Sequence, residues 1–146
     1  MAIPLKQKGG GSNNQIPQEV ICYQVNVQHS KAATANLMQM ISTDKLGMPL
    51  IQELYQYQGK ITGITKGYRK YAYGEGKRRA AIIIQDYTID ALRITQLSDN
   101  DAVLLEINNQ NLSFYAASVY LDYNDPIENI ITVDKILKFT KGKNYY

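Results

Sequence analysis

The sequence predicts a mixed α/β (α+β) sandwich, because two different kinds of strand connection follow one another along the chain. Near the start, a strand–helix–strand order is typical of a parallel βαβ unit. Further on, two apolar runs joined by a polar turn predict an antiparallel hairpin. The 146 residues are 45% hydrophobic and 20% charged, which is an ordinary globular composition and fits one domain.

Residues 1–19 are predicted to form a flexible tail ahead of the domain, which then spans residues 20–146. The tail contains the run Gly-Gly-Gly-Ser-Asn-Asn at 9–14 and little apolar surface. Burial of so few apolar groups cannot offset the entropy that ordering the segment would cost. We therefore assign no secondary structure to it.

The first predicted unit is a strand, a helix and a second strand. Residues 21–27 alternate apolar and polar side chains, which is the pattern of a half-buried strand. Ser30 is placed to cap a helix that runs to about residue 41, with an apolar face formed by Ala33, Leu37, Met40 and Ile41. A short strand follows at residues 48–53, and the order of these elements predicts that the two strands are parallel.

Residues 54–79 are predicted to be a long, polar, glycine-punctuated loop, and loops of this length are usually functional or disordered. The apolar and β-branched runs that follow predict an antiparallel series of strands. These strands are residues 80–84, 88–94, 102–107 and 112–120, the last two joined as a hairpin by the polar turn at 108–111.

A second helix is predicted to begin at Pro126. Asp125 stands at the N-cap position and Glu128 follows three residues later, as in a capping box. We expect the apolar stripe of this helix to consist of Ile127, Ile130, Ile131 and Leu137. Residues 139–146 resemble a helix exit followed by the first residues of another strand, so we expect a sequence that is cut rather than finished.

Composition excludes several classes of protein. The single cysteine, Cys22, allows no internal disulfide and no multi-cysteine zinc site. The longest apolar run, residues 80–84, has five residues, far below the roughly 18–20 that span a bilayer. The first residues lack the apolar core of a secretory signal. We expect an intracellular protein that does not act on a membrane.

The charge is unevenly distributed, although the net charge is only +3. Residues 60–79 carry seven cations against one acid, Glu75, whereas residues 80–134 carry nine acids against Arg93. Cations interleaved with aromatic rings suit nucleic acid, with phosphates on the cations and bases on the ring faces. A solvated loop with tyrosines along the domain edge is an equally good interpretation. The candidate nucleic-acid-binding residues are Tyr55, Lys66, Arg69, Lys70, Lys77, Arg78 and Arg79.

Three polar residues stand at the ends of predicted strands. Asn26 and Glu53 end the two parallel strands, and the carboxyl ends of such strands line ligand crevices. Tyr120 ends a hairpin strand, so the three side chains could form an oxygen-rich site for a hard cation such as Mg²⁺. Taken singly, each also has an ordinary structural role as a turn residue, a cap or a core ring. His29, the only histidine, is interpreted as a helix-start residue rather than a catalytic base.

Three strings of the sequence, taken together, resemble one family. They are Gln-Val-Asn-Val-Gln-His-Ser-Lys-Ala-Ala at 24–33, Leu-Ile-Gln-Glu-Leu-Tyr at 50–55 and Ala-Ala-Ser-Val-Tyr-Leu at 116–121. They are similar to the opening motifs of the endonuclease/exonuclease/phosphatase superfamily, in particular the apurinic-endonuclease-like endonuclease domain of non-LTR (LINE-type) retrotransposons. The resemblance covers residues 21–146. It implies the N-terminal portion of a four-layer sandwich, with two packed mixed β-sheets flanked by helices.

The resemblance also implies an activity, a cofactor and partners. The family cleaves phosphodiesters with Mg²⁺ and nicks DNA to leave a 3′-hydroxyl that primes reverse transcription. By position, Glu53 matches the metal-binding glutamate, Asn26 the asparagine of the metal–phosphate network, and Tyr120 the active-site tyrosine that contacts the phosphate. The loop with Tyr55 would lie near the DNA. DNA is the expected partner, RNA or a reverse transcriptase domain of a longer parent protein are further candidates, and the expected location is nuclear.

The sequence departs from the family pattern in two ways. Asp122 stands where the family often has a proline after the tyrosine, which adds a negative charge near the expected phosphate. The later Gly-Asp-x-Asn and Ser-Asp-His motifs are absent, and with them the catalytic aspartates and histidine. We therefore expect a truncated endonuclease domain that is inactive alone. The alternatives are a non-catalytic nucleic-acid-binding or interaction remnant, and a gene-model fragment with no folded product.

Overall fold

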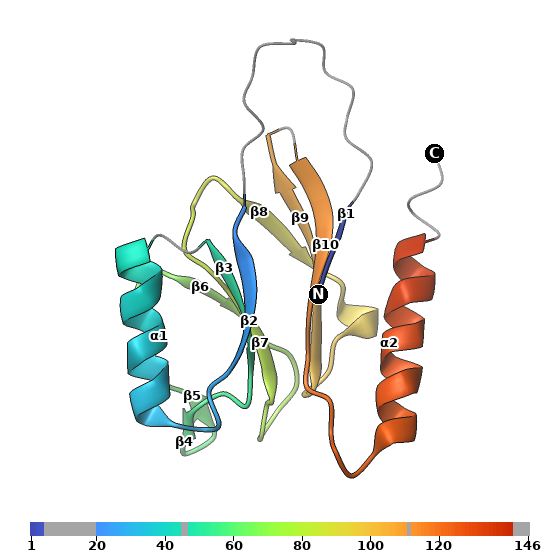
Figure 1. The fold of residues 1–146 in the computed structure, drawn as a ribbon, viewed down its shortest axis with the longest axis horizontal. Helices are drawn as coiled ribbons and strands as arrows, with labels where there is room; N and C mark the ends of the chain where they lie inside the picture. The colour runs from blue at the N-terminus through green and yellow to red at the C-terminus, as the bar shows by residue number, and fades with distance from the viewer. Residues whose placement is uncertain (5–19, 45–46, 111, 142–146) are drawn as a thin grey trace.

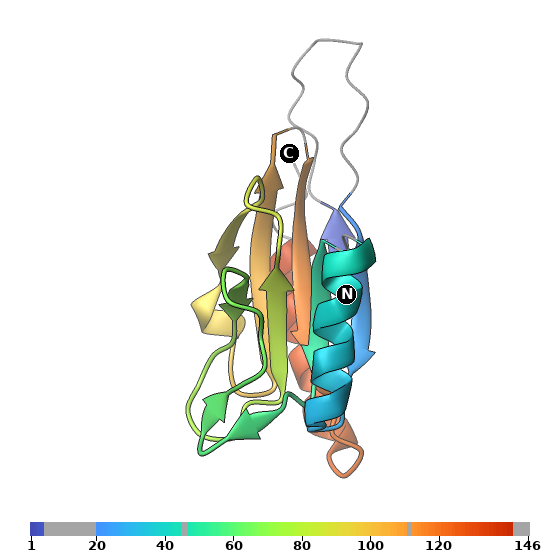
Figure 2. The same cartoon turned by 90° about the vertical axis from the view of Figure 1, so that its left-hand side faces the viewer.

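The computed structural model describes residues 1–4, 20–44, 47–110 and 112–141. Its elements are stacked in four layers (Figure 1): helix α1 (Lys31–Asp44), one β-sheet, a second β-sheet, and helix α2 (Pro126–Lys141). This is the α/β sandwich predicted from the sequence. Figure 2, the view from the α1 side, shows that helix lying along the outer face of its sheet.

The sheet next to α1 is mixed. Its strands lie in the order β2 (Cys22–Asn26), β3 (Met48–Gln52), β7 (Ala80–Ile84) and β6 (Arg69–Tyr71). β2 and β3 are parallel, with Asn26 opposite Gln52, and the other pairs are antiparallel. The predicted βαβ unit is confirmed, including its cap, since the Ala33 N–H donates to Ser30 Oγ at 3.1 Å.

The sheet next to α2 is antiparallel throughout, so the expectation of two mixed sheets is wrong for this one. Its strands lie in the order β1 (Ala2–Pro4), β10 (Leu112–Val119), β9 (Ala102–Asn109) and β8 (Asp90–Arg93). A short 3₁₀ turn, Thr95–Leu97, follows β8. β8, β9 and β10 follow one another along the chain, and direct connections between consecutive neighbouring strands pair them antiparallel.

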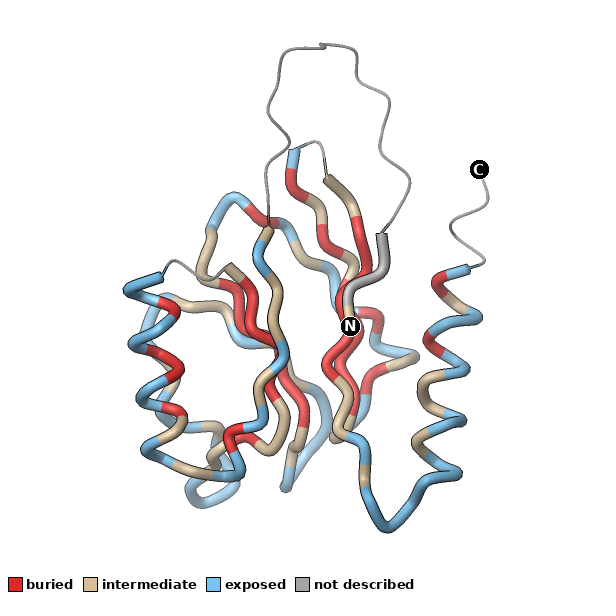
Figure 3. Tube along the Cα trace, viewed as in Figure 1, coloured by how far each residue is buried: buried red, intermediate tan, exposed pale blue. Residues whose placement is uncertain are grey.

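The alternation of side chains along the strands builds the core on both faces of each sheet. In β7, Ala80, Ile82 and Ile84 face the other sheet, whereas Ala81 and Ile83 face α1. All five residues of β7 are buried, as expected for a strand covered on both faces. Leu104, Tyr115 and Ala117 form a third cluster, with Ile136 of α2. Figure 3 shows the buried residues concentrated in the two sheets.

The segment 54–79 differs from the loop that the sequence predicts. It contains a small hairpin, β4 (Gln56–Tyr57) paired with β5 (Lys60–Ile61), and the edge strand β6. The hairpin turns through Gln58 and Gly59, both with positive φ, as two-residue hairpin turns require. β4 and β5 have only two residues each, one exposed and one partly buried, so they are too short to show an apolar alternation by which the sequence could reveal them.

The start of the chain also differs from the predicted flexible tail. Ala2–Pro4 forms β1, which pairs antiparallel with β10 so that Ala2 lies opposite Ala116. The Met1 ammonium group donates to the Ala117 carbonyl at 2.8 Å. Strand pairing with a segment more than a hundred residues away leaves no local signal in the sequence. Residues 5–19, the rest of the predicted tail, lie outside the described residues.

Helix α2 begins as predicted but turns a different face to the sheet. The Glu128 N–H donates to Asp125 Oδ1 at 3.3 Å, which confirms the cap. The predicted apolar stripe is wrong, because Ile127 and Ile130 are 71% and 69% exposed, and Ile131 and Leu137 are exposed as well. Ile136 and Thr140 are buried instead.

The helix therefore has apolar residues on two sides. Only the side with Ile136 is covered by the sheet. Residues 142–146, which belong to the predicted helix exit and strand, lie outside the described part of the chain. Within the described residues, neither helix is long and apolar enough to cross a bilayer.

Candidate active site at the strand ends

Glu53 is held at the end of β3 by its backbone on both sides. Its N–H donates to the Arg79 carbonyl at 2.8 Å, and its own carbonyl accepts from the His29 N–H at 2.8 Å. Its φ is +52°, and φ is also positive at Gln28 and His29. Left-handed backbone at non-glycine residues costs about 1–3 kcal/mol each and is concentrated at functional sites. The Glu53 side chain is 22% exposed, so it is open to a ligand.

Tyr120 lies beside Glu53, although it comes from the other sheet. Burial raises the pKa of the Tyr120 phenol, and the Glu53 carboxylate raises it further through its charge and a hydrogen bond. The Tyr120 N–H donates to the Asp101 carbonyl at 2.8 Å, which fixes the backbone directly after β10. Two of the three predicted site residues, Glu53 and Tyr120, are thus brought together.

A polar contact between the sheets places these two strand ends side by side. The Ser118 hydroxyl donates to the Ile51 carbonyl at 2.8 Å, and Gln52 Nε2 donates to Ser118 Oγ at 3.0 Å. Ser118 is completely buried, so these bonds are made without competition from water. The only signal for this pair in the sequence is a serine that follows two alanines in a largely apolar strand.

Asn26, the third predicted residue, lies one strand away from Glu53. It is exposed at the end of β2, in register with Gln52. Its Oδ1 accepts the Gln28 N–H at 2.8 Å, which is the turn-forming role considered for it in the sequence. Its Nδ2 makes no hydrogen bond within the described residues and remains available to a ligand.

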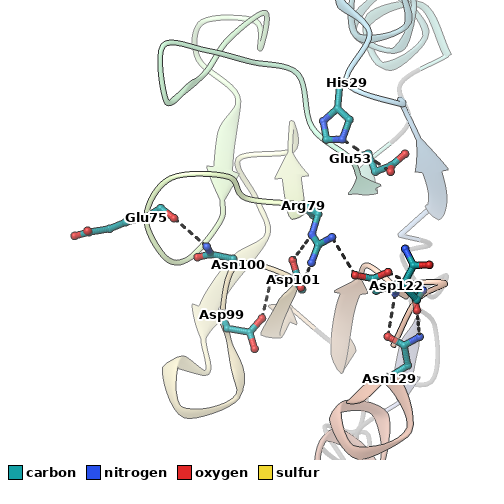
Figure 4. Close-up of polar contacts among 10 residues, drawn as sticks. His29, Glu53, Glu75, Arg79, Asp99, Asn100, Asp101, Asp122 and Asn129 are labelled. Carbon is teal, nitrogen blue, oxygen red and sulfur yellow. Dashed lines mark hydrogen bonds and ion pairs between the residues drawn. The ribbon is translucent and has the colours of Figure 1, made fainter. Parts of the chain in front are cut away.

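Arg79 is the most strongly held side chain of the site (Figure 4). Its Nε and Nη2 donate to the two oxygens of Asp101 at 2.7 and 2.6 Å, and Nη1 reaches Asp122 at 3.4 Å. The hydrogen bonds to Asp101 raise the pKa of the guanidinium. Arg79 also lies over the ring of Tyr120, 4.3 Å from its centroid, within the range of a cation–π contact.

These contacts alter two expectations from the sequence. Arg79 was expected to bind nucleic acid directly, but three of its donors are engaged by carboxylates and its face by Tyr120. Asp122, which replaces the proline of the family pattern, pairs with Arg79, and its N–H donates to Asn129 Oδ1 at 3.0 Å. Its negative charge is therefore partly balanced. The role of Asp101 was missed, because it depends on a loop from another hairpin.

A small acidic cavity of about 120 Å³ adjoins Arg79 and Tyr120. It is lined by five carboxylates, those of Asp99, Asp101, Asp122, Asp125 and Glu128. So many negative charges repel a phosphate from this side.

The predicted nucleic-acid-binding residues fall into two groups. The guanidinium of Arg69 donates to the carbonyls of Asp86 and Ile89, and that of Arg78 to the carbonyl of Gly59. Both are half-buried, as is Tyr55. The exposed lysines, which make no hydrogen bond or ion pair among the described residues, are Lys66, Lys70 and Lys77.

The donor set near Glu53 fits a sparse magnesium site. The described residues hold no group of three or more His, Cys, Asp and Glu side chains that could bind a metal ion. Mg²⁺, however, is often bound by one or two carboxylates, with water and substrate phosphates completing the shell. Asp101 and Asp122 are engaged by Arg79, whereas Glu53 is not. Glu53 is thus the carboxylate here that is not already paired with Arg79.

The fold and part of the sequence are similar to those of a solved structure, the endonuclease domain of TRAS1, a telomere-specific non-LTR retrotransposon. The TM-score is 0.71 at 28% sequence identity, over 84% of this chain. The resemblance to a retrotransposon endonuclease domain is confirmed. The chain spans 54% of the length of that domain. No protein-family model and no curated protein sequence matches the chain.

Proposed function

We propose that the chain provides one side of a Mg²⁺-dependent DNA endonuclease site of a retroelement. The observation that carries this proposal is that Glu53 and Tyr120 stand at neighbouring strand ends of two different sheets, which are joined by the Ser118–Ile51 bond and by Arg79, whose carbonyl accepts from Glu53 and whose guanidinium lies over the Tyr120 ring. The similarity to the TRAS1 endonuclease domain supports it. A fold alone would not assign a function, and the assignment therefore rests on this pair of side chains.

Each residue has a distinct proposed role. Glu53 would hold the cation, and the Asn26 amide and the Tyr120 hydroxyl would donate to phosphate oxygens. A bound divalent cation would neutralise the charge that develops on the phosphate during cleavage. Arg79 acts indirectly, because it holds the Tyr120 ring in place from its position between Asp101 and Asp122.

The proposed partners follow from the same site. DNA is the substrate, contacted along its backbone by Lys66, Lys70 and Lys77, whose ammonium groups are free to reach phosphates. A retroelement endonuclease would also work with RNA or with a reverse transcriptase domain of a longer parent protein. Action on chromosomal DNA places the protein in the nucleus.

We further propose that these 146 residues alone do not cleave DNA. They contain neither a Gly-Asp-x-Asn nor a Ser-Asp-His motif, and groups that move protons typically contribute about 10²–10⁴-fold in rate. Supercoiled plasmid incubated with the purified chain and Mg²⁺ should stay intact. Robust nicking that is lost in Glu53→Ala would contradict this.

Cation-dependent DNA binding tests the site itself. Fluorescence anisotropy with a short labelled duplex should show tighter binding in Mg²⁺ than in EDTA, and Glu53→Gln should remove that difference. Glu75→Gln is the matched control, since Glu75 is exposed and points away from the site (Figure 4). Equal binding by wild type and Glu53→Gln in both buffers would overturn the metal-dependent proposal.

A non-catalytic nucleic-acid-binding remnant is the second candidate. It is favoured by the exposed lysines, which could bind a backbone without any cation at Glu53. In that case the affinity for DNA would be the same in EDTA and Mg²⁺ and would still fall steeply with salt.

A further inference from the structure

His29 makes three contacts with Glu53 and the residue after it, Leu54, at the ends of the neighbouring parallel strands. The His29 N–H donates to the Glu53 carbonyl at 2.8 Å. The ring Nδ1 lies 3.0 Å from the carbonyl oxygen of Leu54, the next residue. The ring Nε2 lies 3.9 Å from Glu53 Oε1 (Figure 4). The imidazole is therefore in contact with the peptide that follows Glu53 and with its carboxylate.

The contact with Leu54 determines which ring nitrogen carries the proton. A carbonyl oxygen accepts hydrogen bonds and cannot donate them, so Nδ1 must be the donor. In the neutral ring, Nε2 is then the nitrogen with the free lone pair, and it faces Glu53. The hydrogen bond at one nitrogen thereby fixes the orientation of the whole ring.

The backbone explains why such a support is needed. Both residues have left-handed φ, +56° at His29 and +52° at Glu53, a conformation that L-residues keep only where the surroundings hold it. Leu54 is buried, and its carbonyl finds its partner in the His29 ring. Loss of that bond would free the turn that carries the Glu53 carboxylate.

We propose that His29 is a positioning residue for Glu53, which it holds through the Nδ1–H bond to the Leu54 carbonyl and the backbone N–H bond to the Glu53 carbonyl. This inference rests on the proposed function, in which Glu53 binds the cation. His29 itself touches neither the cation nor the DNA. These two bonds fix the backbone that carries the Glu53 carboxylate.

The first test is independent of any metal. His29 is the only histidine in the sequence, so nitrogen-15 spectra of an untagged chain contain a single pair of ring signals. At mildly alkaline pH we expect the proton on Nδ1 and a bare Nε2. A proton on Nε2, or an average of the two tautomers, would overturn the inference.

The second test measures affinity for Mn²⁺, the probe cation, from the electron paramagnetic resonance signal of the free ion. His29→Gly removes the ring but tolerates the left-handed backbone, and we expect it to weaken binding by about 10-fold, as loss of a group that orients a metal ligand typically does. His29→Asn should restore affinity close to that of wild type, because asparagine tolerates this backbone and keeps a donor near the position of Nδ1.

Ser30→Ala separates positioning from stability. It removes the neighbouring helix cap and lowers stability, but it should leave Mn²⁺ affinity unchanged. Glu53→Gln should abolish binding. If Glu53→Gln abolishes binding, either of two results overturns the inference alone. In the first, His29→Gly binds Mn²⁺ as tightly as wild type; in the second, His29→Asn binds it as weakly as His29→Gly. If Glu53→Gln binds as wild type, both the proposed metal site and the inference fail.

Discussion

The hydroxyl of Ser118 donates a hydrogen bond of 2.8 Å to the carbonyl of Ile51, across the interface between the two sheets. This buried bond lies two residues before Glu53 on one strand and two residues before Tyr120 on the other. It therefore couples the packing of the sheets to the geometry of the candidate site.

Ser118→Ala should destabilise the chain by about 1–3 kcal/mol. The substitution leaves the Gln52 amide and the Ile51 carbonyl without their buried partner, and unpaired buried polar groups carry a cost of this size. Urea unfolding measures it. Ser113→Ala is the control, because Ser113 is only partly buried and bonds to Asn108 in the same hairpin. Equal effects of the two substitutions would contradict the special role of Ser118.

The orientation of α2 predicts a contrast between two isoleucines. Ile136→Ala should lower the free energy of unfolding by about 2–5 kcal/mol, because it opens a cavity in the core. Ile130→Ala, on the exposed side, should change it by no more than about 0.5 kcal/mol. Thermal or urea unfolding of the two variants compares them directly. A large loss in Ile130→Ala would show that the face assigned from the sequence is the packed one.

Local patterns in the sequence were sufficient for most elements. The strand–helix–strand unit, strand β7, the β9–β10 hairpin and both helix caps have periodicities or capping residues within a few positions of one another. The pairing of β1 with β10 and the hairpin within residues 54–79 have no such signal. The face of α2 was ambiguous for a related reason, since apolar residues at helical spacing occur on two sides of it and only the sheet selects one.

The residues of the candidate site also fall into those with a local signal in the sequence and those without one. Glu53 and Tyr120 could be predicted because strand ends are recognisable in the sequence and converge in such folds. The pairing of Arg79 with Asp101 could not, because it depends on where the loop between β8 and β9 crosses the start of β7. His29 was interpreted as a helix-start residue, which its sequence position supports, and its contact with Glu53 appears only when the parallel strands are aligned.

The environment of Tyr23 predicts that the protein loses stability at alkaline pH. Burial, aided by the charge of Asp44, raises the pKa of Tyr23 to about 12 from 10.0. The folded state thus holds the phenolic proton more tightly than the unfolded state does. The contribution of the protonated Tyr23 phenol to the free energy of unfolding is fully present below pH 10 and is lost as the pH rises toward 12.

Tyr23→Phe should reduce that loss. The Tyr23 hydroxyl is buried with no hydrogen-bond partner among the described residues, so its removal should leave stability at neutral pH unchanged or slightly higher. Urea unfolding at neutral and alkaline pH checks both points. A variant that is clearly less stable at neutral pH would mean that the hydroxyl has a partner.

The contact between Glu53 and Tyr120 can be tested without DNA or metal. Glu53→Gln removes a charge that raises the pKa of Tyr120, so the phenol should ionise at lower pH. The measurement is the tyrosinate absorbance, with Tyr120→Phe used to subtract the other tyrosines. Glu75→Gln should not change the pH at which the Tyr120 phenol ionises. If it shifts Tyr120 as much as Glu53→Gln does, the two side chains are not neighbours.

The two groups of cations in residues 60–79 predict opposite behaviour in DNA binding. Substitution of the exposed lysines, Lys66, Lys70 and Lys77, by alanine should weaken binding and flatten the plot of log K against log salt by up to about 0.9 per lysine. Stability should change little. Arg69→Ala should instead lower the unfolding temperature, because its guanidinium bonds the carbonyls that precede β8. Anisotropy at several salt concentrations and thermal unfolding separate the effects. An unchanged slope in the triple lysine variant would assign these lysines to a solvated surface.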